Sequence, residues 1–241
     1  MHRHTCILAF TILIFFHTVD TVFHLAALKH VIINERSPNQ SIQTNIIGVQ
    51  NIISAASENN IENVIFTSSD KAVNPTSVMG TTKLMGEKLI TASNLRVKNL
   101  KTKFFSLRFG NVIGSSGSVI PIFQKQIMNG GPVTITDNQM TRFFMSLTEC
   151  IKMIIDTLEI ARGGEVFVTK MPAARIVDIA EVMIEELCKN YNIKRSDIKI
   201  KKIGIKAGEK LYEELISEEE IRRTIELKNY YCIIPAYKSI Y

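Results

Sequence analysis

The chain has 241 residues, which is enough for one large domain or two small ones. Its 46% hydrophobic and 22% charged residues are typical of a globular protein, and its net charge of +6 weakly favours an anionic ligand without implying nucleic acid. The four cysteines lie far apart with no Cys-x-x-Cys pair, which excludes a disulfide framework and a Cys/His metal site. This cysteine usage indicates a reducing compartment, so we expect a cytoplasmic protein.

The first 18 residues combine a basic start with an apolar run at residues 6–16. The run is shorter than the roughly 20 residues that a membrane span needs, and no small-residue cleavage site follows it. Three interpretations stay open: an aberrant or truncated start, a buried strand, or a segment with a membrane or targeting role.

Strands and helices alternate along the rest of the chain. The apolar run at residues 19–27 ends in small residues and predicts a buried parallel strand. Ser37 and Pro38 are an N-cap and a first helical residue, so a helix follows to about Asn59. Later patterns predict strands at 62–68, 102–108, 132–136, 165–169 and 198–203, and helices at 77–97, 119–129, 147–161, 176–189 and 209–225. This order predicts an α/β fold, a partial Rossmann-like doubly wound parallel sheet with a small C-terminal subdomain.

Residues 64–83 hold the strongest candidate for a reactive site. An apolar run leads through small hydroxyl residues to Asp70 and Lys71, and a helix then places Met79 and Lys83 four residues apart on one face. Reactive groups commonly lie at the carboxyl end of a strand in α/β enzymes. An Asp-Lys pair facing a second lysine is a compact acid/base set. The alternative is a solvated loop next to an ordinary surface helix.

The segment SSDKAVNPTSVMGTTK at 68–83 resembles the active-site segment of the UDP-N-acetylglucosamine 4,6-dehydratases. More narrowly, it is similar to the CapD-type polysaccharide-biosynthesis branch of the extended short-chain dehydrogenase/reductases. Further matching stretches are VFHLAALKHV at 22–31, LRFGNVIGSSGSVIPIF at 107–123, MTRFFMSLTE at 140–149 and AGEKLYEELISEEEIRR at 207–223. The resemblance covers about residues 19–235.

The resemblance also implies a domain organisation. Residues 19–115 and 143–170 would be the C-terminal half of an NAD(P)-binding domain, and residues 116–142 and 171–241 a UDP-sugar-binding subdomain, with residues 1–18 outside the family pattern. The family opens with a Gly-rich turn that holds the cofactor pyrophosphate, and no such turn precedes Val19. We therefore expect a fragment, or a chain completed by another, that alone binds NAD(P) weakly.

The implied reaction is the dehydration of a UDP-hexose with tightly held NAD or NADP. On this chain Asp70 would protonate the departing 6-hydroxyl group and Lys71 would remove the proton from carbon 5. Lys83 would hold the cofactor ribose, while Ser68 and Ser69 would hydrogen-bond the sugar.

Met79 occupies the position at which most short-chain dehydrogenases have tyrosine. A thioether cannot transfer a proton, but the CapD-type pattern also carries methionine here. Lys71, Asp70 and an ordered water all stay open as the acceptor of the 4-hydroxyl proton.

Further binding residues follow from the resemblance alone. The cofactor set is Leu25, Ala26, Ala27, Lys29, Asn45, Ser68 and Lys83. The substrate set is His30, Asn111, Val119, Ile120, Pro121, Arg142 and Glu209. Several have plain structural alternatives: a satisfied loop histidine at 30, a polar helix position at 45, a surface arginine at 142 and a charge at a helix N-terminus at 209.

Three functions stay in competition. The first is a UDP-sugar dehydratase of surface-polysaccharide synthesis, which Asp70 and Lys71 favour. The second is a UDP-sugar 4-epimerase, which transfers hydride without elimination. The third is a cofactor-free remnant or binding module, which the missing Gly-rich turn favours. We expect a UDP-sugar ligand, a homo-oligomer, no nucleic acid, and membrane association only through residues 6–16.

Overall fold

The computed structural model describes residues 19–96 and 102–236, so the apolar run at 6–16 lies outside the described residues. The chain forms two compact units. Unit 1 contains the described residues up to Phe109, Lys152–Lys170 and the residues from Glu214 on; unit 2 contains Gly110–Ile151 and Met171–Glu213. Residues 110–115 and 143–151 therefore belong to unit 2, and the residues from 214 on to unit 1, which differs from the boundaries expected from the sequence.

Unit 1 is built on a six-stranded sheet in the order β1-β2-β3-β7-β11-β10. Four strands are parallel: β1 (Thr21–His24), β2 (Asn63–Ser69), β3 (Lys103–Phe109) and β7 (Val166–Thr169). The last two, β11 (Tyr230–Ile233) and β10 (Thr224–Glu226), are antiparallel to their neighbours. Because β11 pairs with β7, the C-terminal residues belong to the sheet of unit 1 and not to the smaller unit in which the sequence placed them. The parallel strands end at the same sheet edge, where α/β proteins place their ligands.

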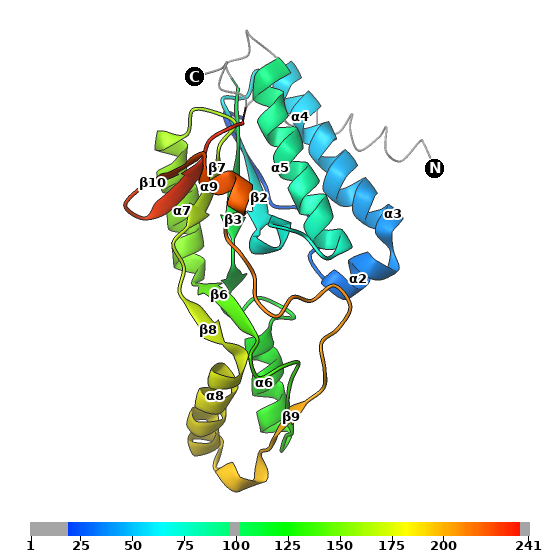
Figure 1. Cartoon of the computed structure of the whole chain (residues 1–241), viewed down its shortest axis with the longest axis vertical. Coiled ribbons are helices and arrows are strands. Elements are labelled where there is room, and N and C mark those ends of the chain that lie inside the picture. Colours follow the sequence, from blue (N-terminus) through cyan, green and yellow to red (C-terminus); the bar gives the residue numbers. More distant parts are fainter. Residues whose placement is uncertain (1–18, 97–101, 237–241) are drawn as a thin grey trace. The chain divides into compact units, whose positions relative to one another are not determined.

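Helices cover both faces of the sheet in unit 1. On one face lie α4 (Gly48–Glu58) and α5 (Val78–Arg96), packed on Val64, Phe66 and Phe104; on the other lies α7 (Leu147–Ile160), packed near Ile65 and Phe105 (Figure 1). The side chains of a strand alternate between faces, so one apolar run supplies both cores. The predicted α/β fold with a doubly wound sheet is confirmed, with two antiparallel strands added.

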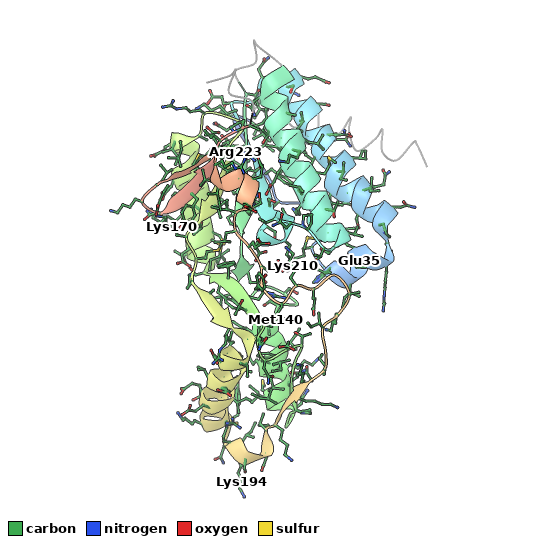
Figure 2. All side chains as sticks on the ribbon, in the orientation of Figure 1. Glu35, Met140, Lys170, Lys194, Lys210 and Arg223 are labelled. Carbon is green, nitrogen blue, oxygen red and sulfur yellow. The ribbon has the colours of Figure 1, made fainter. Side chains whose placement is uncertain are left out.

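Unit 2 is smaller and has its own core. Its strands are β4 (Asn111–Val112), β5 (Val133–Ile135), β6 (Thr141–Met145), β8 (Ala173–Arg175) and β9 (Ile200–Lys202). They form two small sheets, β4-β6-β8 and β5-β9. Helices α6 (Val119–Met128) and α8 (Ile176–Tyr191) enclose a buried cluster that includes Phe123, Met140 and Ile184. Figure 2 labels Met140 in this unit and Lys194 at the turn after α8.

Several elements differ from the sequence-based expectations. No element was expected at residues 31–36, where the structure has a short helix, α2 (Val31–Arg36). The next helix, α3 (Pro38–Ser41), continues through a π-helical segment, Ile42–Ile47, into α4. The helices expected at 209–225 reduce to α9 (Glu218–Ile221), because the chain there returns to the sheet as β10 and β11. Across residues 19–96 and 102–236, no helix is long and apolar enough to span a membrane.

Candidate active site

The carboxyl end of β2 carries the predicted acid/base pair. Ser69 begins the 3-10 turn Asp70–Ala72, its Oγ accepting a hydrogen bond from the Lys71 backbone nitrogen at 3.3 Å. The Ser69 Oγ also donates to Asp70 Oδ1 at 2.8 Å, and Lys71 Nζ donates to the same oxygen at 2.9 Å. The structure therefore brings Ser69, Asp70 and Lys71 together within one turn of chain.

Asp70 is fully buried, and only one of its oxygens is satisfied. Its Oδ2 atom has no hydrogen-bond partner among the described residues, and the same is true of Ser68 Oγ, two residues earlier in the chain. The Lys71 side chain is 22% exposed, against 0% for Asp70. Because an unpaired buried polar atom is unfavourable, these two oxygens are suited to hydrogen-bond a ligand hydroxyl group.

Helix α5 packs directly on this turn. A Cβ atom placed on Gly80 would collide with the Lys71 carbonyl oxygen, so only glycine allows the contact. Ser77 Oγ accepts from the Gly80 nitrogen at 3.1 Å, and Glu35 Oε1, on α2, accepts from the Val78 nitrogen at 2.6 Å (Figure 2 labels Glu35). These bonds satisfy amide groups that the first turn of a helix leaves unpaired.

Met79 and Lys83 follow on α5 and are both buried, with exposed fractions of 4% and 6%. Lys83 Nζ donates to the Thr67 carbonyl oxygen at 2.8 Å and lies 4.8 Å above the centre of the Phe66 ring. Burial lowers the pKa of Lys83 to about 8, and the negative charge of Glu87 opposes that shift. The amine is therefore close to its midpoint of titration at mildly alkaline pH.

Asn45 connects the loop after β1 to α5. Its Oδ1 accepts from the Leu28 nitrogen at 2.8 Å, and its Nδ2 donates to the Leu28 carbonyl at 3.1 Å and to Thr82 Oγ1 at 3.0 Å. The loop itself presents exposed Leu25, Ala26, Lys29 and His30, with Ala27 half-buried. Asn45 therefore holds the expected cofactor loop beside the residue that precedes Lys83.

His24 is a buried site residue that sequence reasoning missed. It ends β1, stacks on Phe66 with ring centres 5.9 Å apart, and has an Nε2 atom without a partner among the described residues. Burial, and then the charge of Lys83, lower its pKa to about 4. A histidine inside an apolar strand was the signal that could have identified it.

A charged cluster behind Lys83 was also missed. Arg108, at the end of β3, pairs with Glu87 of α5 and Glu220 of α9, and all three are buried. The available signals were an arginine closing an apolar strand and a glutamate four residues after Lys83.

The remaining substrate residues lie in unit 2. Asn111 is on β4, and Val119, Ile120 and Pro121 form the half-buried first turn of α6. Buried Arg142, on β6, donates to the carbonyl oxygens of Thr141 at 2.7 Å, Lys210 at 2.9 Å and Leu211 at 3.3 Å. Arg142 thereby holds the chain segment that contains Glu209.

Glu209 is engaged within its own turn. Its Oε2 accepts from the Lys206 nitrogen at 3.2 Å, and its nitrogen donates to the Lys206 carbonyl at 3.1 Å. No carboxylate pairs with Arg142 among the described residues, so its positive charge is balanced only by carbonyl dipoles. A buried guanidinium with that environment suits an anionic ligand.

Comparison with known proteins identifies the family. A family profile described as "Polysaccharide biosynthesis protein" matches residues 10–235, so the match begins earlier than the expected residue 19. The "Uncharacterized membrane protein MJ1061" of Methanocaldococcus jannaschii is 50% identical over 217 residues, 90% of this chain and 65% of the relative. The "UDP-N-acetylglucosamine 4,6-dehydratase (inverting)" of Campylobacter jejuni is 43% identical over 223 residues, 92% of this chain and 64% of the relative.

Two further similarities bear on the activity and the fold. A protein of Rickettsia canadensis named "UDP-glucose 4-epimerase" is 42% identical over 218 residues, 90% of this chain and 62% of the relative. The X-ray structure of Pen from Bacillus thuringiensis superposes with a TM-score of 0.92 at 43% identity, covering 95% of this chain and 70% of that one. The family suggested by the sequence motifs is thus confirmed, and the chain belongs to the polysaccharide biosynthesis protein family that includes the UDP-N-acetylglucosamine 4,6-dehydratases.

Proposed function

We propose that this chain carries the acid/base and sugar-binding residues of a UDP-sugar 4,6-dehydratase that acts on a UDP-N-acetylglucosamine-like substrate for surface polysaccharide. The observation that carries this proposal is the buried Asp70, with one unpartnered oxygen, held beside Lys71 at the carboxyl end of a parallel strand. The name of the 43% identical C. jejuni relative supports it. The chain spans 65% and 64% of the first two relatives, so the activity of the whole protein is part of the proposal.

In this proposal the two residues act on opposite sides of an elimination. Lys71 removes the proton from carbon 5 of the 4-keto sugar. Asp70, whose Oδ2 atom has no partner among the described residues, supplies the proton with which the 6-hydroxyl group leaves as water. A bound nicotinamide supplies reversible hydride transfer, from carbon 4 of the sugar and finally to carbon 6. The oxidation at carbon 4 also releases the 4-hydroxyl proton, and carbon 5 regains a proton as hydride is added at carbon 6. The overall change is therefore the loss of one water with no net oxidation.

The residues of unit 1 fit the nicotinamide end of NAD or NADP, on the evidence of their polar atoms. Lys83 has a buried amine held by the Thr67 carbonyl, with two further N–H groups for ribose hydroxyls. Small side chains at Ala26 and Ala27 leave the backbone accessible after β1. Asn45 holds this loop through both of its hydrogen-bonding atoms. Within unit 2, Asn111, Arg142 and Glu209 are the residues that the family resemblance assigns to UDP-sugar binding.

A UDP-sugar 4-epimerase is the second candidate. The 42% identical R. canadensis relative carries that name. Epimerisation needs hydride transfer at carbon 4 and no proton transfer at carbon 5 or 6. It therefore leaves the Asp70-Lys71 pair without a chemical role, which is why we rank it second.

The test is to incubate the chain with UDP-N-acetylglucosamine and NAD+ or NADP+ in heavy water, to separate the nucleotide sugars by chromatography, and to analyse each by mass spectrometry. A dehydratase forms a product that has lost one water and gained solvent deuterium at carbon 5. An epimerase forms an isomer of unchanged mass without deuterium. Absence of both products, together with no cofactor binding by calorimetry, supports a binding module and contradicts both enzyme proposals.

A further inference from the structure

Arg108 forms the centre of a buried charge cluster in unit 1. Its Nε and Nη2 donate to the two carboxylate oxygens of Glu87 at 3.1 and 2.7 Å. Its Nη1 and Nη2 donate to Glu220 at 3.1 and 3.0 Å, and Nη1 also reaches the Leu215 carbonyl at 2.7 Å. All five N–H groups of the guanidinium are thus directed at acceptors, and the three side chains together carry one net negative charge.

Lys83 lies one helical turn before Glu87 on α5, on the same face. Both side chains are buried, with exposed fractions of 6% and 2%. Lys83 donates to the Thr67 carbonyl but forms no ion pair within the described part of the chain. Its ammonium charge therefore needs a counter-charge nearby, because an isolated buried cation is unfavourable.

We propose that Glu87 is a positioning residue that supplies the counter-charge for the Lys83 ammonium, and that Arg108 and Glu220 hold it in place. The cluster of Lys83, Glu87, Arg108 and Glu220 is then electrically neutral as a whole. Glu220 lies 112 residues after Arg108, so a segment distant in the sequence would regulate the charge state of Lys83. Its meaning for cofactor binding rests on the proposed function, whereas the electrostatic role does not.

The other charged groups around Lys83 do not supply this counter-charge. His24, from β1, has a pKa of about 4 because of burial and the charge of Lys83, so it is neutral near pH 7. Asp70, in the following turn, pairs with Lys71. Glu87 is the group whose charge raises the pKa of Lys83 against the stronger effect of burial.

The geometry also keeps Glu220 ionised. Burial favours its neutral form, but the hydrogen bonds and charge of Arg108 outweigh burial and lower its pKa to about 2. A capping box at Ser217 adds a bond from the Ser217 nitrogen to Glu220 Oε2 at 2.9 Å. Arg108 is therefore bound by two carboxylates at once. Glu220 fixes the position of the Arg108 guanidinium, and the guanidinium in turn fixes the orientation of Glu87.

The experiment is a titration of Lys83 by NMR in the full chain labelled with ¹³C at lysine Cε. The Lys83 signal is assigned by its loss in Lys83→Arg. In Glu87→Gln the midpoint should fall by roughly 1 pH unit, as expected from the loss of a nearby charge in a partly buried site. In Glu220→Gln the fall should be smaller, because Glu220 lies beyond Arg108. In Glu58→Gln, which removes an exposed carboxylate at the end of α4, the midpoint should not move.

A folded Glu87→Gln protein with an unchanged Lys83 midpoint would overturn the proposal. If that variant does not fold, Glu220→Gln decides the matter, and an unchanged or raised midpoint there contradicts the proposal equally. Glu87→Asp keeps the negative charge, so its Lys83 midpoint should lie close to that of the wild type rather than to that of Glu87→Gln. A role of Glu87 in packing alone would not produce this difference between the two variants. The titration uses no substrate, so failure of the dehydratase assay leaves its outcome interpretable.

Discussion

At the scale of single residues, the site is defined by polar atoms that are buried without a protein partner. Asp70 Oδ2, Ser68 Oγ and His24 Nε2 all fall in this class among the described residues. Folded proteins satisfy nearly all such atoms. Three of them at the carboxyl ends of two neighbouring strands indicate a place where a ligand completes the hydrogen bonding.

Lys71→Ala should abolish dehydration if the proposed function is right. The variant removes the base for the carbon 5 proton, and general acid/base catalysis typically contributes on the order of 10²- to 10⁴-fold. The measurement is the rate of 4-keto-6-deoxy product formation from UDP-N-acetylglucosamine. Lys88→Ala, which changes an exposed lysine on α5, is the matched control and should retain its rate. Wild-type turnover in Lys71→Ala would remove Lys71 from the mechanism.

Met79→Leu should leave most of the activity and stability intact. Met79 is 4% exposed, and leucine has nearly the same volume, so we expect a loss of less than about 1.5 kcal/mol in the free energy of unfolding. A thioether transfers no proton, so the chemical step should not depend on it. Activity as low as that of Lys71→Ala would show that this position takes part in the chemistry.

His24 should make the protein less stable in mild acid. Its folded pKa of about 4 lies below the ordinary 6.5, so between these pH values the unfolded chain binds a proton that the folded protein does not. The contribution of neutral His24 to the free energy of unfolding is therefore fully present above pH 6.5. It falls by up to about 3 kcal/mol as the pH drops towards 4. Urea unfolding of wild type and His24→Phe at pH 7 and pH 5 tests this.

His24→Phe keeps an aromatic ring against Phe66 and removes the titrating group. Its unfolding free energy should fall less between the two pH values than that of the wild type. His30→Gln, which changes an exposed histidine in the following loop, should keep the wild-type pH dependence. Equal pH dependence in all three proteins would mean that His24 is protonated without penalty in the fold.

At the scale of elements, α5 is the helix that organises the site. It carries Met79, Lys83 and Glu87, and it contacts the Asp70–Ala72 turn through Gly80 and the Phe66 ring through Gly86. Each glycine marks a place where a Cβ atom would meet a neighbouring group. The helix therefore lies closer to β2 and its turn than larger side chains would allow.

Gly80→Ala should destabilise the protein although alanine is the better helix former. The added Cβ collides with the Lys71 carbonyl oxygen, which is backbone, and such overpacking typically costs about 1–3 kcal/mol. Gly48→Ala is the matched control, because its Cβ would meet only the Gln43 carbonyl oxygen, at 3.8 Å. This variant should gain about 1 kcal/mol in the free energy of unfolding from the better helix propensity of alanine. Chemical denaturation should give opposite signs for the two variants, and a stabilised Gly80→Ala would contradict the close contact.

At the scale of the whole chain, the C-terminal segment returns to the first sheet. It places β11 beside β7 and brings Glu220 into contact with Arg108. The ion pairs of Arg108 with Glu87 and Glu220 thereby connect β3, α5 and α9. A buried ion cluster of this kind is destabilising when one member is removed, because the remaining charges lose their partner. The cluster therefore makes the fold of unit 1 depend on residues near the end of the chain.

Arg108→Met should lower the free energy of unfolding by about 3–5 kcal/mol, because it leaves two buried carboxylates facing each other. The triple variant Arg108→Met, Glu87→Leu, Glu220→Leu should recover much of that loss, since an apolar cluster of similar volume needs no counter-charges. Denaturant unfolding at neutral pH measures both. A triple variant no more stable than Arg108→Met would mean that the geometry of the ion cluster itself is required.

The sequence by itself determined the parallel strands, the main helices and the turn that carries Ser69, Asp70 and Lys71. Each of these has a local cause: an apolar run, a proline at the first helical position (Pro38), or a polar loop directly after a strand. The Ser37 side chain, expected to cap that helix, forms no capping hydrogen bond. The family followed from contiguous motifs for the same reason. Neighbours in the chain remain neighbours in space.

Only the tertiary structure decided the antiparallel strands β10 and β11, the short α2 and the partners of the buried charges. Arg108 meets Glu87 and Glu220 across 21 and 112 residues of chain, and Asn45 meets Thr82 across 37. Such contacts leave no periodicity in the sequence. The residue type alone does not distinguish a buried arginine or glutamate from an exposed one. Whether a charged side chain lies at the surface or in a neutral cluster depends on which distant segment packs against it.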